Sequence, residues 1–223
     1  MRTYHANEIG NVAVLGHSGC GKTSIIEAMA YRSGLIKRAG TINEGNTISD
    51  YSDEEINRKS SVNLSIIPVE WNNCKINLID VPGTFDFVGE CEAALSVCES
   101  ALIIDPATPG ISAGTKQAMY KARDKAKIIY INGLDNPNSD YPTKLQQLKD
   151  TYGKVIAPIQ VPIMENNKMI GYVNVAKMEG RIFDGDHTIP GDIPEDLMNE
   201  ILPIKEMIDE AVANTSDELL EKY

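Results

Sequence analysis

The stretch that decides the fold is Gly16-His17-Ser18-Gly19-Cys20-Gly21-Lys22-Thr23. It matches the pattern G-x-x-x-x-G-K-[ST] in full, between the apolar run Ile9–Leu15 and the helix-patterned segment Lys22–Ser33. Glycines in such a loop let the backbone wrap a phosphate with its N–H groups pointing inward, and the helix N-terminus adds partial positive charge. The stretch therefore predicts a strand, a phosphate-binding loop and a helix.

The loop supplies most of the expected contacts to a bound nucleotide. Lys22 has the reach to contact β- and γ-phosphates and is the first candidate catalytic residue, while the Thr23 hydroxyl can ligate Mg²⁺. The expected nucleotide-binding residues in this part of the chain are Gly16, His17, Ser18, Gly19, Cys20, Gly21, Lys22, Thr23 and Ser24.

A second motif, Asp80-Val81-Pro82-Gly83, ends the expected strand Lys75–Asp80. A carboxylate at that place can hold the Mg²⁺ shell, and the Gly83 amide can sense a γ-phosphate. D-x-P-G alone is a common turn, but downstream of a phosphate loop and at a strand end it becomes specific. Asp80 and Gly83 are thus expected at the nucleotide, with Asp80 also at the metal.

A third motif, Asn132-Gly133-Leu134-Asp135, follows the expected strand Ile128–Asn132. A carboxylate in the place of Asp135 accepts hydrogen bonds from N1–H and the 2-amino group of guanine, a donor pair that adenine lacks. The N-x-x-D pattern is weak alone, but its position after the phosphate loop favours guanine. We expect Asn132 and Asp135 to bind the base of GTP or GDP.

The segment Ala39–Lys59 is polar and has no periodicity, so it is expected to be a long loop, and such loops are usually functional or mobile. Just after it, the Ser61 hydroxyl is a candidate Mg²⁺ ligand, in addition to the Thr23 hydroxyl and the Asp80 carboxylate. A solvated polar loop is the alternative interpretation.

Short apolar strands that alternate with helical stretches predict an α/β protein of the P-loop NTPase type, with a mostly parallel sheet and helices on both faces. We expect this core to cover residues 1–154. Its remaining expected elements are the strands Val62–Trp71 and Ala101–Asp105 and the helices 112–125 and 140–152.

From Val155 the pattern changes, and residues 155–223 are expected to form a small α+β subdomain. Two alternating strands are expected around the turn Asn166-Asn167. The expected elements are the strands Ile159–Ile163 and Gly171–Val175, the helix Pro194–Asn214 and a shorter helix capped near Ser216.

Composition excludes several partner classes. The 21 basic and 32 acidic residues give a net charge of −11, so no DNA partner is expected. No apolar run approaches the roughly 20 residues that span a bilayer, and no signal-peptide core is present, so no membrane partner is expected. The four cysteines, without zinc spacing, are typical of reduced thiols in a cytoplasmic protein.

These motifs, in this order and spacing, resemble those of translational GTPases, most closely bacterial elongation factor G. The resemblance implies a domain that binds GTP or GDP with Mg²⁺ and hydrolyses GTP to switch its interaction with the ribosome. Residues 155–223 are similar to the insertion subdomain inside that factor's GTPase domain. Asp50-Tyr51, Pro68–Trp71 and Asp86–Glu90 look more like the second, elongation factor G-like paralogue group.

Four positions depart from that family. Thr84 stands where the family carries a histidine that positions the attacking water, so Thr84 marks the second candidate catalytic position and weak hydrolysis is expected. Gly19 replaces an aspartate, Gly133 replaces a lysine whose stem packs on the base, and Ser61 replaces a threonine.

In the family a further strand with a Ser-Ala motif follows the insertion and completes the guanine pocket. The resemblance therefore implies an N-terminal fragment of a longer protein, expected to be monomeric and to lack the last strand and helix of the core. Two alternatives to a GTPase are a nucleotide-sensing module with little hydrolysis, suggested by Thr84, and an ATPase or kinase, against which Asp135 argues.

Overall fold

The computed structural model describes residues 2–166, 168–213 and 217–222. The chain forms two compact units, Met1–Gly133 and Leu134–Tyr223. The expected division into domains 1–154 and 155–223 stays a prediction. The expected turn at Asn167, the helix end at Asn214 and the cap at Ser216 lie outside the described residues.

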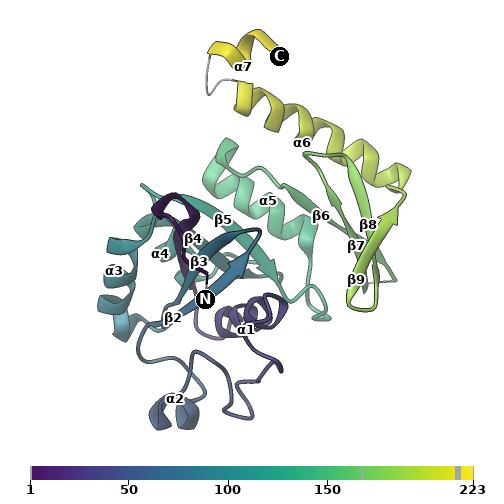
Figure 1. Cartoon of the computed structure of the whole chain (residues 1–223). Helices are drawn as coiled ribbons and strands as arrows, with labels where there is room; N and C mark the ends of the chain where they lie inside the picture. The colour runs from purple at the N-terminus through teal and green to yellow at the C-terminus, as the bar shows by residue number, and fades with distance from the viewer. Residues whose placement is uncertain (1, 167, 214–216, 223) are drawn as a thin grey trace. The chain divides into compact units, whose positions relative to one another are not determined.

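A mostly parallel sheet forms the centre of the first unit (Figure 1). Its strand order is β2-β3-β1-β4-β5, and only the β2–β3 pair is antiparallel. The strands are β1 (Ile9–Gly16), β2 (Ser65–Trp71), β3 (Cys74–Asp80), β4 (Ser100–Pro106) and β5 (Ala126–Asn132). The predicted mostly parallel sheet is confirmed.

Helices cover both faces of this sheet, as predicted. Successive side chains of β1 point to opposite faces, and both faces carry apolar side chains that need to be buried. Val14 packs in one buried cluster with Ile26 of α1 (Lys22–Arg32). The helices of the second face are α3 (Val88–Val97) and α4 (Ala113–Lys121). Leu15 packs in the other cluster with Ala94 of α3 and Ala118 of α4.

The carboxyl ends of the parallel strands share one edge of the sheet, and the order in which strands are added reverses at β1. From β1 it passes through α1 and β2 to β3 on one side, and then through α3 to β4 on the other side. Ligands of open α/β sheets bind at such a switch point, outside the carboxyl ends of the strands. The loop after β1 lies at this point.

The expectation of an unstructured loop over Ala39–Lys59 is wrong in one part, because α2 (Asp53–Arg58) lies within it. Ser52 caps this helix: its side chain accepts from the Glu55 amide, and the Glu55 side chain accepts from the Ser52 amide. This reciprocal capping box stabilises a helix too short for apolar periodicity to reveal. Helix α3 was also not predicted.

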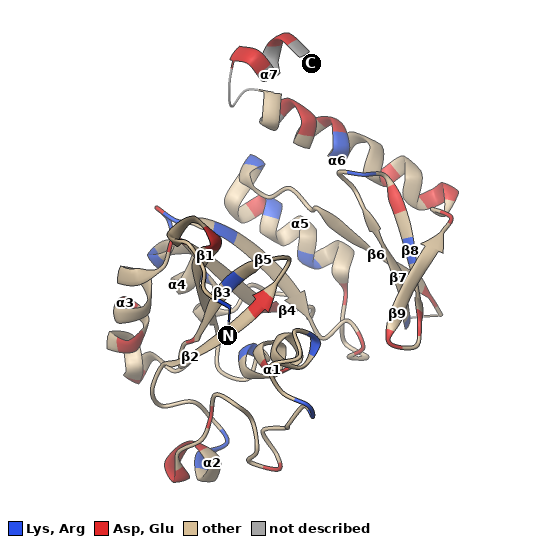
Figure 2. Ribbon diagram, in the orientation of Figure 1, with Lys and Arg blue, Asp and Glu red and all other residues tan. Residues whose placement is uncertain are grey.

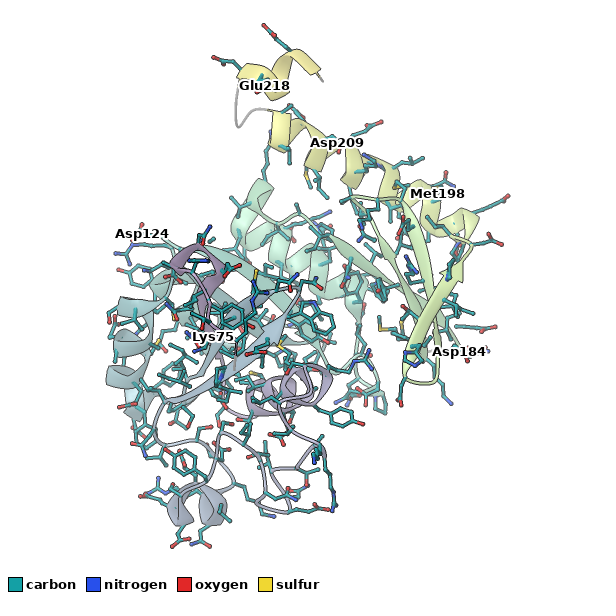
Figure 3. The ribbon with its side chains drawn as sticks, in the orientation of Figure 1. Lys75, Asp124, Asp184, Met198, Asp209 and Glu218 are labelled. Atoms are coloured by element: carbon teal, nitrogen blue, oxygen red, sulfur yellow. The ribbon has the colours of Figure 1, made fainter. Side chains whose placement is uncertain are left out.

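The second unit contains a separate antiparallel sheet in the order β6-β7-β8-β9. Ile201 of its long helix packs with Val161 and Val173 of the sheet. Figure 3 labels Met198 and Asp209 on that helix. The elements are α5 (Tyr141–Tyr152), β6 (Gln160–Glu165), β7 (Lys168–Asn174), β8 (Glu179–Asp184), β9 (His187–Gly191), α6 (Glu195–Ala213) and α7 (Asp217–Lys222).

The strands β8 and β9 were not predicted from the sequence. Residues 187–190 of β9 are all exposed, so the strand carries no alternation of buried apolar and exposed polar side chains. Short single turns complete the described chain at η1 (Ala6–Glu8), η2 (Phe85–Phe87) and η3 (Gly153–Val155). Within the described residues, no helix has both the length and the apolar character needed to cross a membrane.

Candidate functional site

The predicted phosphate loop joins the end of β1 at Gly16 to the start of α1 at Lys22. Gly19 and Gly21 adopt φ angles of 76° and 97°, in the left-handed region that favours glycine. A Cβ on Gly21 would lie 2.3 Å from Nδ2 of Asn132, and one on Gly16 would lie 2.4 Å from the carbonyl oxygen of Ile104. Side chains at these positions would therefore distort the loop.

Lys22 is 6% exposed, and its ammonium group turns back over the loop. Nζ donates to the carbonyl oxygens of Gly16 (3.2 Å) and His17 (3.1 Å). Gly83 packs against the same group, since a Cβ there would lie 2.4 Å from Nζ of Lys22 and 2.6 Å from the amide nitrogen of Ser18. The first two sequence motifs thus meet at the Lys22 ammonium.

The three predicted metal ligands also lie together. The Thr23 hydroxyl donates to Oδ2 of Asp80 at 2.8 Å, and its oxygen lies 3.4 Å from Oγ of Ser61. All three side chains are buried. They come from the start of α1, the end of β3 and the segment after α2.

Asp50 is a fourth oxygen-bearing side chain, beside Ser61 and Asp80, that no sequence motif marks. It is 5% exposed, and neither of its carboxylate oxygens has a hydrogen-bond partner among the described residues; the same is true of Oδ1 of Asp80. Burial raises the pKa of Asp50 by more than the neighbouring Ser61 hydroxyl lowers it. Burial likewise raises the pKa of Asp80, to about 6, despite the hydrogen bond from Thr23.

Buried carboxylates without partners are costly, and a divalent cation removes that cost. Mg²⁺ prefers oxygen ligands, often one or two carboxylates completed by hydroxyls, water and phosphate. The donor set of Thr23, Ser61, Asp50 and Asp80 fits this preference. The one hint of Asp50 in the sequence was the resemblance of Asp50-Tyr51 to a known family, because no local pattern marks a loop residue as buried.

The third motif approaches the loop through Asn132. Its Nδ2 donates to the carbonyl oxygen of Cys20 at 2.9 Å, and its own carbonyl oxygen accepts from the Ala107 amide at 2.7 Å. Gly133 follows with φ of 78°, again left-handed. Asp135 is exposed and belongs to the second unit, so its contact with a base stays a prediction.

Two buried polar atoms lie near the Gly83 turn without hydrogen-bond partners among the described residues: Oγ1 of Thr84 and Nδ1 of His17. The His17 ring contacts that of Phe85, with centroids 6.1 Å apart. A cavity of about 30 Å³, lined by Gly83 and Thr84 among others, opens beside the turn. This volume is sufficient for a water molecule. Ser24, by contrast, lies exposed on α1.

Comparison with known proteins assigns the chain to a family. The model of the elongation factor Tu GTP binding domain matches residues 7–216 of the chain. The chain belongs to this family. The predicted membership among translational GTPases is thereby confirmed, and guanine nucleotides are the ligands that the family implies.

Individual relatives agree with this assignment. Elongation factor G of Mycoplasma genitalium and that of Mycoplasma pneumoniae are each 27% identical to the chain over 227 residues, which cover all of it and 33% of each relative. A solved structure from Thermus thermophilus has a TM-score of 0.90 and 31% identity over 96% of the chain and 33% of the other protein. The chain thus spans about a third of the length of these relatives. The paralogue group within the family stays a prediction.

Proposed function

We propose that this domain binds GTP and GDP together with Mg²⁺ and hydrolyses GTP slowly, as the nucleotide switch of an elongation factor G-like translational GTPase. The observation that carries the proposal is the meeting of Lys22, the Thr23–Asp80 pair and the Gly83 turn at one end of the phosphate loop. The family membership of residues 7–216 supports the same ligand class.

The phosphates are bound by the backbone amides of the loop and by Lys22. In the structure the Lys22 ammonium bonds two carbonyl oxygens of its own loop. A β- or γ-phosphate oxygen is a stronger acceptor than a neutral carbonyl, because the hydrogen bond is then charge-assisted on both sides. Lys22 therefore exchanges these contacts for the phosphates and stabilises the charge that develops during γ-phosphoryl transfer.

Mg²⁺ would be held by the hydroxyls of Thr23 and Ser61, with the carboxylates of Asp80 and Asp50 beside them. When bound, the ion neutralises negative charge on the β- and γ-phosphate oxygens. The protein contributes a buried, oxygen-rich site and fixes the Thr23 hydroxyl through its hydrogen bond to Asp80.

The base is recognised by Asn132 and Asp135. Asn132 links the end of β5 to the phosphate loop through its bond to Cys20, so that base and phosphate contacts are set by one side chain. Asp135 accepts from N1–H and the 2-amino group of guanine and gives the preference over adenine.

Hydrolysis is slow in this proposal because Thr84 follows the Gly83 turn. Its buried hydroxyl can orient a water through a hydrogen bond, but it cannot take up a proton at neutral pH as an imidazole can. The same observation supports a second candidate function, a nucleotide-sensing module with little hydrolysis. Single-turnover assays of the full-length protein with ribosomes separate the two, since brisk phosphate release excludes the sensing module.

Calorimetry with GDP and ADP on the full-length protein tests the proposal. We expect GDP to bind at least about tenfold more tightly, from hydrogen bonds between the Asp135 carboxylate and the base. The Asp135→Ala variant should lose that preference, whereas Asp124→Ala, which removes an exposed carboxylate labelled in Figure 3, should keep it. Equal affinity of the unmodified protein for both nucleotides would refute the guanine assignment.

The wider role is proposed by analogy with the relatives named elongation factor G. The full-length protein would dock on the ribosome in the cytoplasm, and the domain would act as a monomer without DNA or membrane partners. The free state of Cys20, Cys74, Cys91 and Cys98 supports a reducing compartment.

A further inference from the structure

Carboxylates from three helices accept hydrogen bonds from backbone amides of the segment between α1 and β2. The first is Glu27, which lies on the inner side of α1 and is 3% exposed. Its Oε1 accepts from the Gly40 amide at 2.7 Å, and its Oε2 accepts from the Ile48 amide at 2.8 Å. One buried carboxylate thus fastens two separate points of the segment to α1.

The second carboxylate is that of Glu55 on α2, a side chain that is 2% exposed. Its Oε1 accepts from the amides of Val62 (3.0 Å) and Asn63 (3.2 Å). Its Oε2 accepts from the Ser52 hydroxyl (2.7 Å) and amide (3.2 Å). The Glu55 carbonyl oxygen also accepts from the Ser60 amide at 3.2 Å. Glu55 therefore holds the backbone on both sides of Ser61.

These contacts suit an ionised carboxylate, because every partner is a donor. Burial acts to raise the pKa of Glu55, but the hydrogen bonds from Val62, Ser52 and Asn63 outweigh burial and lower the pKa below its ordinary value. Figure 2 shows that α2 is an acidic helix, and the neighbouring Glu54 instead pairs with Arg58 at 2.9 Å on the surface. Of the two adjacent glutamates, Glu55 is buried and holds the backbone, whereas Glu54 is exposed to solvent.

The third carboxylate is that of Glu90 on α3, whose Oε2 accepts from the Leu64 amide at 2.8 Å. Helix α3 begins at Val88, shortly after the Gly83 turn. The Leu64 peptide lies just after the residues that Glu55 holds. Glu90 therefore links the segment that carries Ser61 to the helix that follows Gly83.

We propose that Glu55 is the positioning residue for Ser61, and that Glu27 and Glu90 fix the two ends of the same segment, residues 40–64. Among the candidate metal ligands, Thr23 lies in α1 and Asp80 lies in β3, where ladder hydrogen bonds hold the backbone. Ser61, like Asp50, belongs to neither a helix nor a strand, so its order depends on loop contacts such as those that Glu55 makes. This inference rests on the proposed binding of GTP and Mg²⁺.

The consequence concerns discrimination between nucleotides. Ser61 is expected to join the Mg²⁺ shell in the triphosphate state, in which the loop is ordered, and not in the diphosphate state. A change at Glu55 should therefore weaken triphosphate binding selectively. A mere loss of fold stability would instead weaken both nucleotides alike, which separates positioning from a general structural role.

The Glu55→Gln variant tests this proposal, with Glu54→Gln as a matched control on the same helix. The glutamine oxygen can keep one pair of donors, but its NH₂ group then faces N–H or O–H donors on the other side. By calorimetry with Mg²⁺ on the full-length protein, we expect Glu55→Gln to weaken a non-hydrolysable GTP analogue about tenfold and GDP less than about twofold. Equal losses for both nucleotides, or none, would overturn the proposal.

Amide hydrogen exchange of residues 60–64, measured without nucleotide, provides an independent readout. We expect about tenfold faster exchange in Glu55→Gln than in the unmodified protein, and no change in Glu54→Gln. Unchanged exchange in Glu55→Gln would refute the positioning role. If the unmodified protein binds no guanine nucleotide, the proposed function fails, whereas this exchange measurement still decides whether Glu55 orders the backbone around Ser61.

Discussion

The hydroxyl of Thr23 donates a 2.8 Å hydrogen bond to Oδ2 of Asp80, across a sequence separation of 57 residues. The bond joins the first turn of α1 to the end of β3 and fixes two of the candidate metal ligands relative to each other. Asp80 is 1% exposed and its second oxygen has no partner among the described residues, so that oxygen remains available to a cation or its water shell.

Thr23→Val should remove most of the magnesium dependence of nucleotide binding. Valine keeps the shape of threonine but lacks the hydroxyl that both bonds Asp80 and offers an oxygen ligand. We expect the ratio of GDP affinities with Mg²⁺ and with EDTA to fall at least about tenfold. Thr188→Val, at an exposed position of β9, should leave the ratio unchanged. An unaltered ratio in Thr23→Val would place the ion elsewhere.

Gly83→Ala should abolish nucleotide binding, because the added Cβ would lie 2.4 Å from the Lys22 ammonium and 2.6 Å from the Ser18 amide nitrogen. Gly89→Ala, in α3, meets nothing within 4 Å and should preserve binding. It should also raise stability by up to about 1 kcal/mol through helix propensity. Calorimetry and thermal unfolding check both variants. Normal GDP affinity in Gly83→Ala would mean that the turn does not pack on the phosphate site.

Gly133→Lys should destabilise the fold. The backbone there has φ of 78°, a left-handed conformation that costs an L-residue about 1–2 kcal/mol. No atom lies within 4 Å of an added Cβ, so the cost is conformational rather than steric. We expect the free energy of unfolding to fall by about 1 kcal/mol, and by less in Gly133→Asn, since asparagine tolerates this region. Equal stability of both variants in urea titrations would contradict this account. A gain in GDP affinity for Gly133→Lys would show separately that the lysine stem packs on the base.

Alkylation of the folded protein at pH 8 should modify Cys74 first. Cys74 is exposed, whereas Cys98 is buried and its pKa is raised to about 11 by burial and by the neighbouring Glu99 carboxylate. Burial also raises the pKa of Cys20. The thiolate is the reactive form, so the last two should react only after unfolding. Mass mapping of iodoacetamide adducts gives the order, and early modification of Cys98 would contradict the burial.

The sequence predicted the core of the first unit well because its strands carry continuous apolar runs. A strand covered by helices on both faces must be apolar throughout, and the largely buried β4 was recognisable for this reason. β5 was recognisable from its apolar run as well, although Ile128 and Tyr130 on one of its faces are exposed. The phosphate loop was recognisable for a different reason. Its glycines allow the positive φ angles that such a loop needs, and Gly19 and Gly21 adopt these angles.

Prediction failed where order comes from polar contacts. Helix α2 is only 6 residues long and depends on the reciprocal bonds between Ser52 and Glu55, for which the spacing S-x-x-E is the local sequence signal. Strands β8 and β9 of the second unit lack the apolar alternation on which strand prediction relies.

By itself, the sequence determined the phosphate-loop motif and predicted which residues contact phosphate, because those residues follow one another along the chain and their spacing is fixed by backbone geometry. Only the tertiary structure showed that Asp50 is buried without a partner among the described residues, that Ser61 lies 3.4 Å from Thr23, and that Glu27, Glu55 and Glu90 hold the segment between them. The physical reason is that a carboxylate which accepts hydrogen bonds from distant amides produces no periodic pattern in the sequence. Its partners are backbone groups, which every sequence contains, so only the fold decides which of them it contacts.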